Sequence, residues 1–326
     1  MQSETLYKIF KAKNLIFITN YLQLINALEL YYQKKIYKNI LVVTDNKKIF
    51  RKKKIINILS NTYNINKLQI CYIDNKINTN LLFKLILLFI FKNYVSIING
   101  NYFADKFNLF MFLRCENKYF VDDGTSTLLI NEKDNKQGML IKIIKFLFIN
   151  LNFKLTFFTS YNKVNDIFQY KIKNNYDYLK KKLSIKKVNT HEMYILGTNL
   201  INDKEYFLEE NYIDHINIIK SKFIKKKISY FPHPREQMSK KFKQLLKKMG
   251  IKIIISNLPI ELYLKSLSNI PKNFISFYSS SYIVLKIIFQ NSLSLFFYND
   301  YFLIKNNKKY RIFSKYFSKN FKNIGG

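Results

Sequence analysis

Hydrophobic positions along the chain alternate between short continuous runs and helical spacing, beginning near the N-terminus. Residues 15–19 read LIFIT, an apolar run typical of a buried strand. The segment that follows, 21–34, carries apolar residues at helical spacing, and Asn20 before it is a plausible N-cap. These positions lie on one helical face: Leu22, Ile25, Leu28 and Tyr32. The pattern predicts a strand, a turn and a helix as the opening unit.

The same alternation continues through the first half of the chain. Strands are predicted at 40–44, 68–73, 95–98 and 119–121, with helices near 48–59, 80–91 and 103–113. Residues 136–161 are basic and apolar, and residues 162–190 are polar, rich in Lys and Asn, and show no clear strand pattern. We place a domain boundary in that polar stretch.

A second alternating series follows the polar stretch. Strands are predicted at 193–196, 227–231, 252–256, 274–278 and 293–298, with helices near 204–223, 237–249, 259–267 and 281–290. Strands that alternate with helices favour parallel sheets covered by helices on both faces. We therefore predict an α/β protein with two Rossmann-like domains, at 1–185 and 186–300, and a basic-aromatic tail at 301–326.

The charge of the chain changes this picture only in part. Lys and Arg number 55 against 21 Asp and Glu, a net charge of +34, which predicts an anionic partner such as nucleic acid, an anionic membrane or a phosphorylated substrate. However, the chain is crowded with Lys, Asn, Ile, Phe and Tyr, and has no Trp and 7 Gly. That bias is what an A+T-rich genome would impose, so the charge carries less functional meaning than its size suggests.

Cysteine usage and hydropathy indicate where the protein works. Cys71 and Cys115 have no CxxC spacing, which favours a reducing compartment and argues against a structural zinc. Residues 1–13 lack the apolar core of a cleavable signal. The longest apolar run, 81–91, contains Lys84 and is shorter than the roughly 20 residues that span a bilayer. We expect a cytoplasmic protein, at most peripheral on the inner face of the cytoplasmic membrane.

Two adjacent carboxylates close one predicted strand. Asp122 and Asp123 should point in different directions, and Gly124 lets the backbone turn sharply. One carboxylate could be held by the scaffold while the other acts as a general base. The alternative is an acidic turn, because Asp-Gly is a common turn dipeptide.

A histidine stands where another predicted strand gives way to a helix. The string YFPHPRE places His233 at that point, and in open α/β sheets ligands bind outside the carboxyl ends of the strands. His233 could donate a proton or a hydrogen bond to a departing phosphate, and Arg235 adds a fixed cation. The alternative is a surface-turn histidine. We interpret His191 and His215 as structural.

Three further polar motifs follow strands of the second half. Ser279, Ser280 and Ser281 open a helix, where hydroxyl and backbone N–H groups suit an anion, although serines also cap helices for stability alone. Gly197 and Thr198 form a loop after one strand, and Glu261 lies in the first turn of another helix. With His233 these motifs should converge on one sheet edge, which outlines a nucleotide-sugar site.

These motifs resemble those of bacterial sialyltransferases. That group shares an acidic motif ending in Gly, a His-Pro motif and a Ser-rich motif, which here are Asp122-Asp123-Gly124, His233-Pro234 and Ser279-Ser280-Ser281. The strings YFPHPRE, PIE and ITNYLQLINALEL are most similar to glycosyltransferase family 52, the lipooligosaccharide and capsule sialyltransferase group. The resemblance covers roughly residues 15–297.

The resemblance implies a GT-B fold, in which two Rossmann-like domains with parallel sheets face a central cleft. It also implies inverting transfer of sialic acid from CMP-sialic acid to a terminal sugar, often galactose, without a required metal or other cofactor. The N-terminal domain would bind the acceptor glycan and the C-terminal domain the nucleotide sugar.

Roles carried over from the family fall on single residues. Asp123 would be the base beside Asp122, and His233 would assist loss of CMP. Ser280 and Ser281 would hold the phosphate with Ser279, Gly197, Thr198 and Arg235 nearby, and Glu261 would bind the ribose. Asn20 and Gln23 would contact the acceptor. In family 52 the base can come from nearer the His-Pro motif, which leaves Asp203, Glu210 and Asp214 as candidates.

The tail mixes basic and aromatic residues over 305–323, which suits an anionic membrane surface and a lipid-linked acceptor. An equal alternative is a final helix that packs back on the first domain with a solvated basic face. Two rivals to the sialyltransferase hypothesis stay open: a GT-B enzyme with another nucleotide sugar such as a UDP-sugar, and a basic nucleic-acid-binding protein. A homodimer is also compatible with the sequence.

Overall fold

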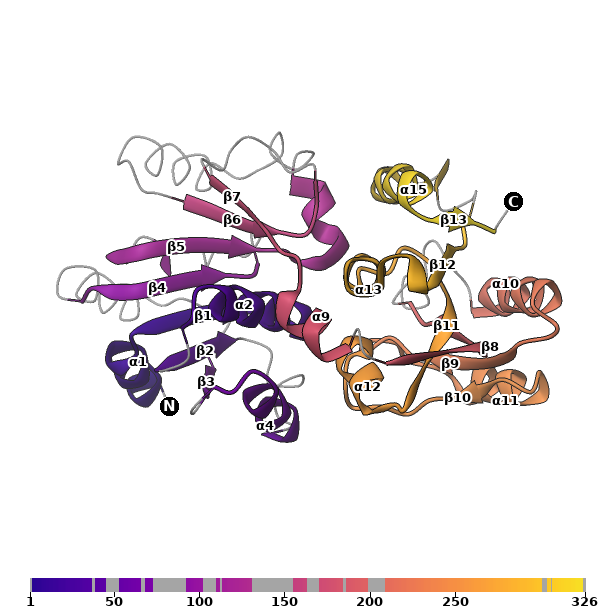
Figure 1. The fold of residues 1–326 in the computed structure, drawn as a ribbon, viewed down its shortest axis with the longest axis horizontal. Coiled ribbons are helices and arrows are strands. Elements are labelled where there is room, and N and C mark those ends of the chain that lie inside the picture. The colour runs from indigo at the N-terminus through magenta and orange to yellow at the C-terminus, as the bar shows by residue number, and fades with distance from the viewer. Residues whose placement is uncertain are drawn as a thin grey trace. The chain divides into compact units, whose positions relative to one another are not determined.

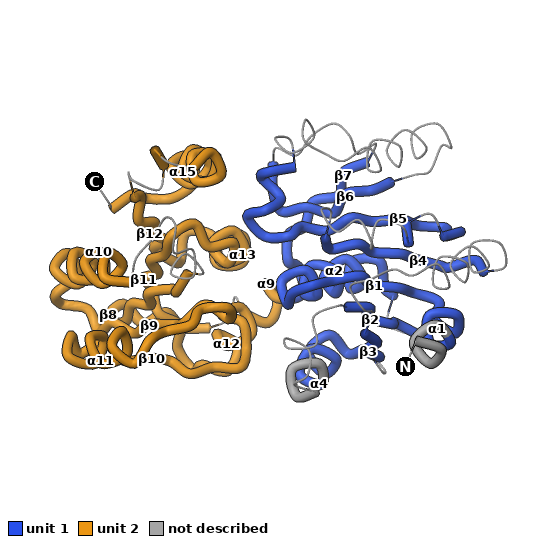
Figure 2. Tube along the Cα trace, turned by 180° about the vertical axis from the view of Figure 1, so that it is seen from behind, with its two compact units in different colours: residues 1–178 blue, residues 179–326 orange. Residues whose placement is uncertain are grey.

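The computed structural model describes residues 2–36, 39–44, 53–65, 68–72, 92–101, 110–111, 113–130, 155–162, 170–183, 186–198, 209–300, 304–305 and 307–324. The chain divides into two compact units, Met1–Tyr178 and Leu179–Gly326, coloured separately in Figure 2. Each unit contains a sheet with helices packed around it (Figure 1).

The first unit is built on a seven-stranded sheet whose described pairings are all parallel. Its order is β3-β2-β1-β4-β5-β6-β7. These strands are β1 (Asn14–Ile18), β2 (Ile40–Thr44), β3 (Gln69–Tyr72), β4 (Tyr94–Asn99), β5 (Cys115–Val121), β6 (Leu155–Thr159) and β7 (Tyr170–Lys173). The order turns back between β1 and β4, as in a Rossmann fold, and that point is where a crevice forms at the carboxyl ends.

The second unit repeats this plan with a six-stranded sheet, again parallel at every described pairing. Its order is β10-β9-β8-β11-β12-β13, so β8 and β11 correspond to β1 and β4. These strands are β8 (Lys187–Leu196), β9 (Lys227–Phe231), β10 (Lys252–Ile253), β11 (Asn269–Ser276), β12 (Ser294–Phe297) and β13 (Lys322–Asn323). The predicted α/β class with two Rossmann-like sheets is therefore confirmed.

Helices connect and cover the strands. In the first unit these are α1 (Gln2–Lys11), α2 (Tyr21–Gln33), α4 (Lys53–Thr62) and the 3-10 helix η1 (Gly124–Leu129), and α9 (Asp177–Leu183) leads into the second. The second unit has α10 (Glu209–Lys222), α11 (Lys240–Lys248), α12 (Ile260–Ser266), α13 (Ser281–Phe289), the 3-10 turn η4 (Gln290–Ser292) and α15 (Lys308–Asn320). The predicted cap of α2 is present, because Asn20 and Gln23 form a capping box. The predicted helices at 80–91 and 103–113 lie almost wholly outside the described residues.

One prediction from the polar stretch was wrong. Residues 162–190 were expected to lack strands, but Tyr170–Lys173 forms β7 and β8 begins at Lys187. Strand β7 is the edge of the first sheet and is largely exposed, so it can consist of polar and basic residues without losing its pairing to β6. Hydrophobic alternation gives little signal in such a strand.

The C-terminal residues belong to the second unit rather than forming a separate tail. Tyr310, Phe313 and Phe317 of α15 are buried, and β13 adds to the sheet beside β12. The ring of Phe317 lies 6.0 Å from that of Phe297 in β12 and 5.6 Å from that of Tyr278. The final helix therefore packs back on the chain, as one of the two alternatives expected, but on the second unit. Within the described residues, no helix is long and apolar enough to cross a membrane.

Candidate functional site

The carboxyl edge of the first sheet brings together the ends of β1, β4 and β5. Gly100 follows β4, and a methyl group in place of its hydrogen would lie 2.7 Å from Cβ of Gln23 in α2. The glycine therefore lets α2 start close against the end of β4. Asn101 adds a 3.4 Å hydrogen bond to the hydroxyl of Thr19 across the point where the strand order reverses.

Asp123 is held at this edge by the two predicted acceptor-contacting residues. The Asn20 side chain donates to Asp123 Oδ1 at 2.9 Å, and the Gln23 amide donates to the same oxygen. Gln23 Oε1 in turn accepts from the backbone of Thr19 at 2.6 Å, which fixes the amide orientation. Asp123 is half-buried. The structure thus places Asp123 in one cluster with Asn20 and Gln23, which lie 103 and 100 residues before it in the sequence.

Asp122 points into the protein interior, where it is 1% exposed. Its oxygens accept from Thr159 Oγ1 at 2.6 Å, Ser160 N at 2.6 Å and Ser160 Oγ at 2.7 Å. Burial raises the pKa of Asp122 to about 6, and these hydrogen bonds oppose the rise. Gly124 follows with φ of 60°, which favours glycine, so the backbone turns and separates the two carboxylates. Asp122 ties β5 to the end of β6.

The carboxyl edge of the second sheet carries the predicted donor-binding motifs. Gly197 and Thr198 follow β8; Ser279 and Ser280 lie between β11 and α13, and Ser281 is the first residue of α13. The hydroxyl of Ser276 donates to the Leu196 carbonyl at 3.1 Å, which ties the ends of β8 and β11 together. Ser280 is the N-cap residue of α13 but makes no capping hydrogen bond through its side chain. These motifs lie at the strands on either side of the reversal in strand order.

His233 follows β9 and is half-buried. Its Nδ1 accepts from the Arg235 backbone N–H at 3.2 Å, so the proton of the neutral ring lies on Nε2. Burial, together with the charge of Arg235, lowers the pKa of His233 to about 4. Near pH 7 the ring is therefore neutral and offers an N–H from Nε2. The Arg235 side chain is exposed.

Glu261 and Ser281 are brought together, although they belong to different helices. Glu261 is 3% exposed and its carboxylate accepts a hydrogen bond from the Ser281 side chain. Burial raises the pKa of Glu261, and the bond from Ser281 opposes that rise. The contact links α12 to α13 at the end where the serine motif lies.

Sequence reasoning missed Glu236, which lies beneath the His-Pro turn. Its Oε2 accepts from the His233 backbone N–H at 2.9 Å and its Oε1 accepts from the Tyr230 hydroxyl. A signal was present, because Glu236 stands three residues after His233, the spacing at which a side chain returns to a backbone N–H. Thr159 and Ser160, the partners of Asp122, were also missed because β6 was not predicted.

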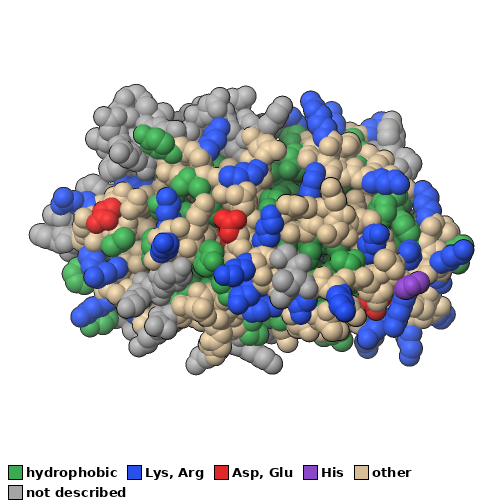
Figure 3. Space-filling model, viewed as in Figure 1, with side chains coloured by type: hydrophobic (Ala, Val, Ile, Leu, Met, Phe, Trp, Pro, Cys, Tyr) green, Lys and Arg blue, Asp and Glu red, His purple; other side chains and the backbone are tan. Residues whose placement is uncertain are grey.

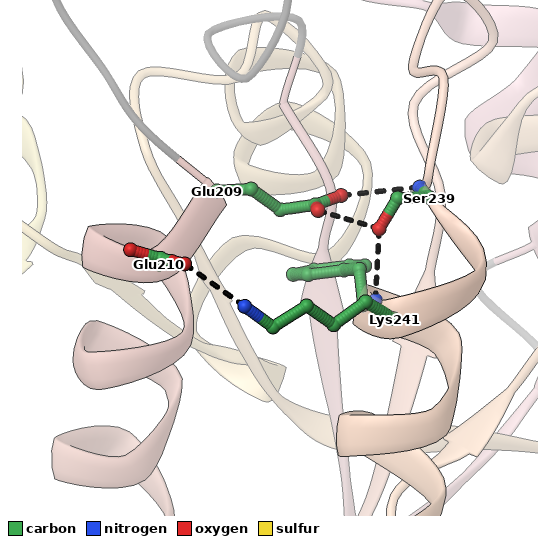
Figure 4. Close-up of polar contacts among 5 residues, drawn as sticks. Glu209, Glu210, Ser239 and Lys241 are labelled. Atoms are coloured by element: carbon green, nitrogen blue, oxygen red, sulfur yellow. Dashed lines mark hydrogen bonds and ion pairs between the residues drawn. The ribbon is translucent and has the colours of Figure 1, made fainter.

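The alternative base candidates have different surroundings. Glu210 is exposed and forms a 2.9 Å ion pair with Lys241, which lowers the pKa of its carboxyl, the opposite of what a base at neutral pH needs. Its neighbour Glu209 accepts from Ser239, the residue that caps α11, so both glutamates join α10 to α11 (Figure 4). Asp214 is exposed on α10, and Asp203 lies outside the described residues.

The other two histidines differ in their surroundings. His215 of α10 pairs with Asp300 at 2.7 Å, against the rings of Phe277 and Tyr298, and His191 is exposed in β8. Among the described residues, no group of three or more His, Cys, Asp or Glu side chains is placed to hold a metal ion.

Comparisons with known proteins find similarity in structure but none in sequence. No protein-family model matches the chain, and no curated protein matches it in sequence. The crystal structure of MurG from Acinetobacter baumannii is similar with a TM-score of 0.47 at 10% identity, over 96% of this chain and 86% of that one. The resemblance to family 52 therefore stays at the level of short motifs, and the Rossmann-like character of each unit follows from its own strand order.

Proposed function

We propose that the chain is a GT-B glycosyltransferase, in which the second unit holds a nucleotide-sugar donor and the first activates the acceptor hydroxyl. A GT-B fold consists of two Rossmann-like domains in tandem, and this chain has two such units. The observation that carries the proposal is the gathering of Gly197, His233 and the serine motif at the carboxyl edge of the second sheet, where such sheets bind nucleotides.

The donor phosphate would lie at the start of α13. Backbone N–H groups at a helix N-terminus favour an anion, and Ser279, Ser280 and Ser281 add hydroxyl groups there. His233 would donate a hydrogen bond from Nε2 to the leaving phosphate, with the guanidinium of Arg235 close in sequence as a countercharge. Glu261, fixed by Ser281, would accept from the ribose hydroxyls. Thr198 would line the same edge.

On the first unit Asp123 would be the general base. It is half-buried and held by Asn20 and Gln23, so its carboxylate is oriented before the substrate binds. Asp122, whose carboxylate is turned inward, would fix the strand end that presents Asp123. Asn20 and Gln23 would also contact the acceptor. Positioning such a base contributes roughly 10²–10⁴-fold to the rate.

For the donor we propose CMP-sialic acid, on the strength of the three short motifs, with inverting transfer to a terminal sugar such as galactose and no metal or other cofactor. The acceptor would be a surface glycan such as lipooligosaccharide or capsule, reached at the inner face of the cytoplasmic membrane. A UDP-sugar fits the same sheet edge equally well. Figure 3 shows Lys and Arg side chains scattered over the visible face rather than gathered in one stripe, which supports a glycosyltransferase over a nucleic-acid-binding protein.

The test is thermal unfolding with CMP, UDP or GDP. A nucleotide at 100 times its dissociation constant stabilises the folded state by about 2.7 kcal/mol, so CMP should raise Tm clearly. Ser281→Ala should reduce that rise, whereas Glu116→Gln, an exposed change on the first unit, should leave it intact. Stabilisation by UDP alone would mean that the donor is a UDP-sugar instead of CMP-sialic acid. No stabilisation by any nucleotide, with salt-sensitive gel shifts of RNA or DNA, would overturn the proposal.

A further inference from the structure

We propose that Glu236 is the positioning residue of His233: it holds the His-Pro turn from beneath, so that Nε2–H of the ring is presented to the donor phosphate. The inference rests on the proposed function, because it names what orients the histidine of that site. Glu236 itself need not touch the donor.

Glu236 holds both peptide groups of His233. The His233 N–H donates to Glu236 Oε2 at 2.9 Å, and the Glu236 N–H donates to the His233 carbonyl at 2.9 Å. The Arg235 N–H then reaches His233 Nδ1 at 3.2 Å. Three hydrogen bonds within four residues thus fix the backbone and the ring tautomer together. Since Nδ1 accepts, Nε2 is left as the donor.

The Glu236 carboxylate is in turn held by its surroundings. Its other oxygen accepts from the hydroxyl of Tyr230, which also lies 3.2 Å from the hydroxyl of Tyr212 in α10. Gly197 leaves the room that this arrangement needs. A methyl group at that position would lie 2.2 Å from Glu236 Oε2 and 2.7 Å from the His233 nitrogen. The Glu236 carboxylate therefore lies against both the loop after β8, at Gly197, and the turn after β9, at His233.

Ionisation of Glu236 should matter to the turn. An ionised carboxylate accepts from His233 and Tyr230 together, whereas a protonated one uses an oxygen as a donor. The groups that face it are Tyr230 of β9, Tyr212 and Glu209 of α10, and His233 and Arg235 of the turn. The pKa of Glu236 is raised to about 7: burial raises it, the bonds from Tyr230 and His233 oppose the rise, and the charge of Glu209 adds to it.

Tyr230, Tyr212 and His233, which face Glu236, have pKa values outside the range in which Glu236 titrates. The pKa values of Tyr230 and Tyr212 lie well above 10, and that of His233 is lowered to about 4. Between pH 6 and 8, Glu236 is the group with a shifted pKa inside the window. The ionised fraction of a group with a pKa near 7 falls from pH 8 to pH 6, so nucleotide affinity should fall over the same range.

The experiment compares Glu236→Ala, Glu236→Gln and the control Glu116→Gln with the natural chain. Nitrogen-15 NMR of the imidazole ring, assigned through His233→Asn, should show a neutral Nε2–H tautomer at pH 8. Glu236→Ala should mix the two tautomers, because the backbone N–H of His233 loses its acceptor. Glu236→Gln should keep the tautomer, because the amide oxygen still accepts from the backbone.

Affinity for CMP gives the second readout. The natural chain should lose more affinity than Glu236→Gln between pH 8 and 6; the phosphate of CMP also titrates in this range and affects both alike. The inference is overturned if the tautomer of the His233 ring is the same in all variants. It is also overturned if the pH dependence of CMP affinity is the same for the natural chain and for Glu236→Gln. If no nucleotide binds but the tautomer responds as expected, the positioning role stands and the proposed function fails. Should Glu236→Ala not fold, the Gln comparison still decides.

Discussion

At the scale of single residues, two neighbouring aspartates differ because their surroundings differ. Asp122 is enclosed and accepts three hydrogen bonds from Thr159 and Ser160. Asp123 is half-buried and accepts from the side chains of Asn20 and Gln23. Adjacent residues at a strand end face opposite ways, so one carboxylate can support the scaffold while the other meets a substrate.

Asp122→Asn should therefore act on stability. An amide replaces one of the two acceptor oxygens by an NH₂ group, which would face either the donor of Thr159 or the two donors of Ser160, at a cost of about 2–3 kcal/mol. Folding raises the pKa of Asp122 from 3.8 to about 6, so the folded state binds this proton more tightly than the unfolded state. The resulting contribution to the free energy of unfolding is complete below pH 3.8 and is lost as pH rises through about 6. Urea unfolding should show the gap between the natural chain and Asp122→Asn narrowing from pH 5 to pH 8.

Asp123→Asn is the matched comparison. It should reduce the proposed glycosyl transfer by roughly 10²–10⁴-fold while changing the free energy of unfolding less than Asp122→Asn. If Asp122→Asn instead lost more activity and Asp123→Asn lost more stability, Asp122 would be assigned as the general base.

At the scale of elements, α15 shows how a basic-aromatic segment can be a core helix. Its aromatic side chains at 310, 313 and 317 are buried, while Arg311, Lys315 and Lys319 are exposed. The spacing of three and four residues separates the two kinds of side chain onto opposite faces. The segment therefore stabilises the second unit, and only its cationic face is available to a membrane.

Phe317→Ala should destabilise the second unit by about 3–5 kcal/mol, because the ring is fully buried beside Tyr278, Phe297 and Phe321. Lys315→Ala, two residues away on the exposed face, should stay within about 0.5 kcal/mol of the natural chain. Differential scanning calorimetry would measure both. Equal effects of the two substitutions would contradict the packing of α15.

For the whole molecule, a net charge of +34 predicts attraction to an anionic surface such as a membrane. Because Tyr310, Phe313 and Phe317 of α15 are buried, attraction by this helix would be electrostatic and would not include insertion of those three rings. Such attraction weakens as salt is added.

Flotation with vesicles containing phosphatidylserine should recover the protein at low salt and release it at high salt. Replacing Arg311, Lys315 and Lys319 together by Gln should weaken binding about a hundredfold, at about 1 kcal/mol per basic residue near the surface. Equal binding to neutral phosphatidylcholine vesicles, or no loss in the triple variant, would show that α15 does not mediate membrane attraction.

The sequence by itself determined the alternation of strands and helices, since burial of a parallel strand requires a continuous apolar run. Strands β1, β2, β9 and β12 and the cap of α2 at Asn20 lie close to where the pattern predicts them. It also located the polar motifs at strand ends, because parallel strands present their carboxyl ends together. It failed at β7, an exposed edge strand without an apolar alternation.

Only the tertiary structure decided which polar residues meet. The pairing of Asp123 with Gln23, of Glu261 with Ser281, and of Asp122 with Ser160 joins segments 20 to 100 residues apart. It also showed Glu236 beneath His233, at a position where Gly197 leaves space for its carboxylate. Local pattern records which face of an element is apolar, whereas the partner of a polar side chain depends on sheet order and on the room left by neighbouring backbones.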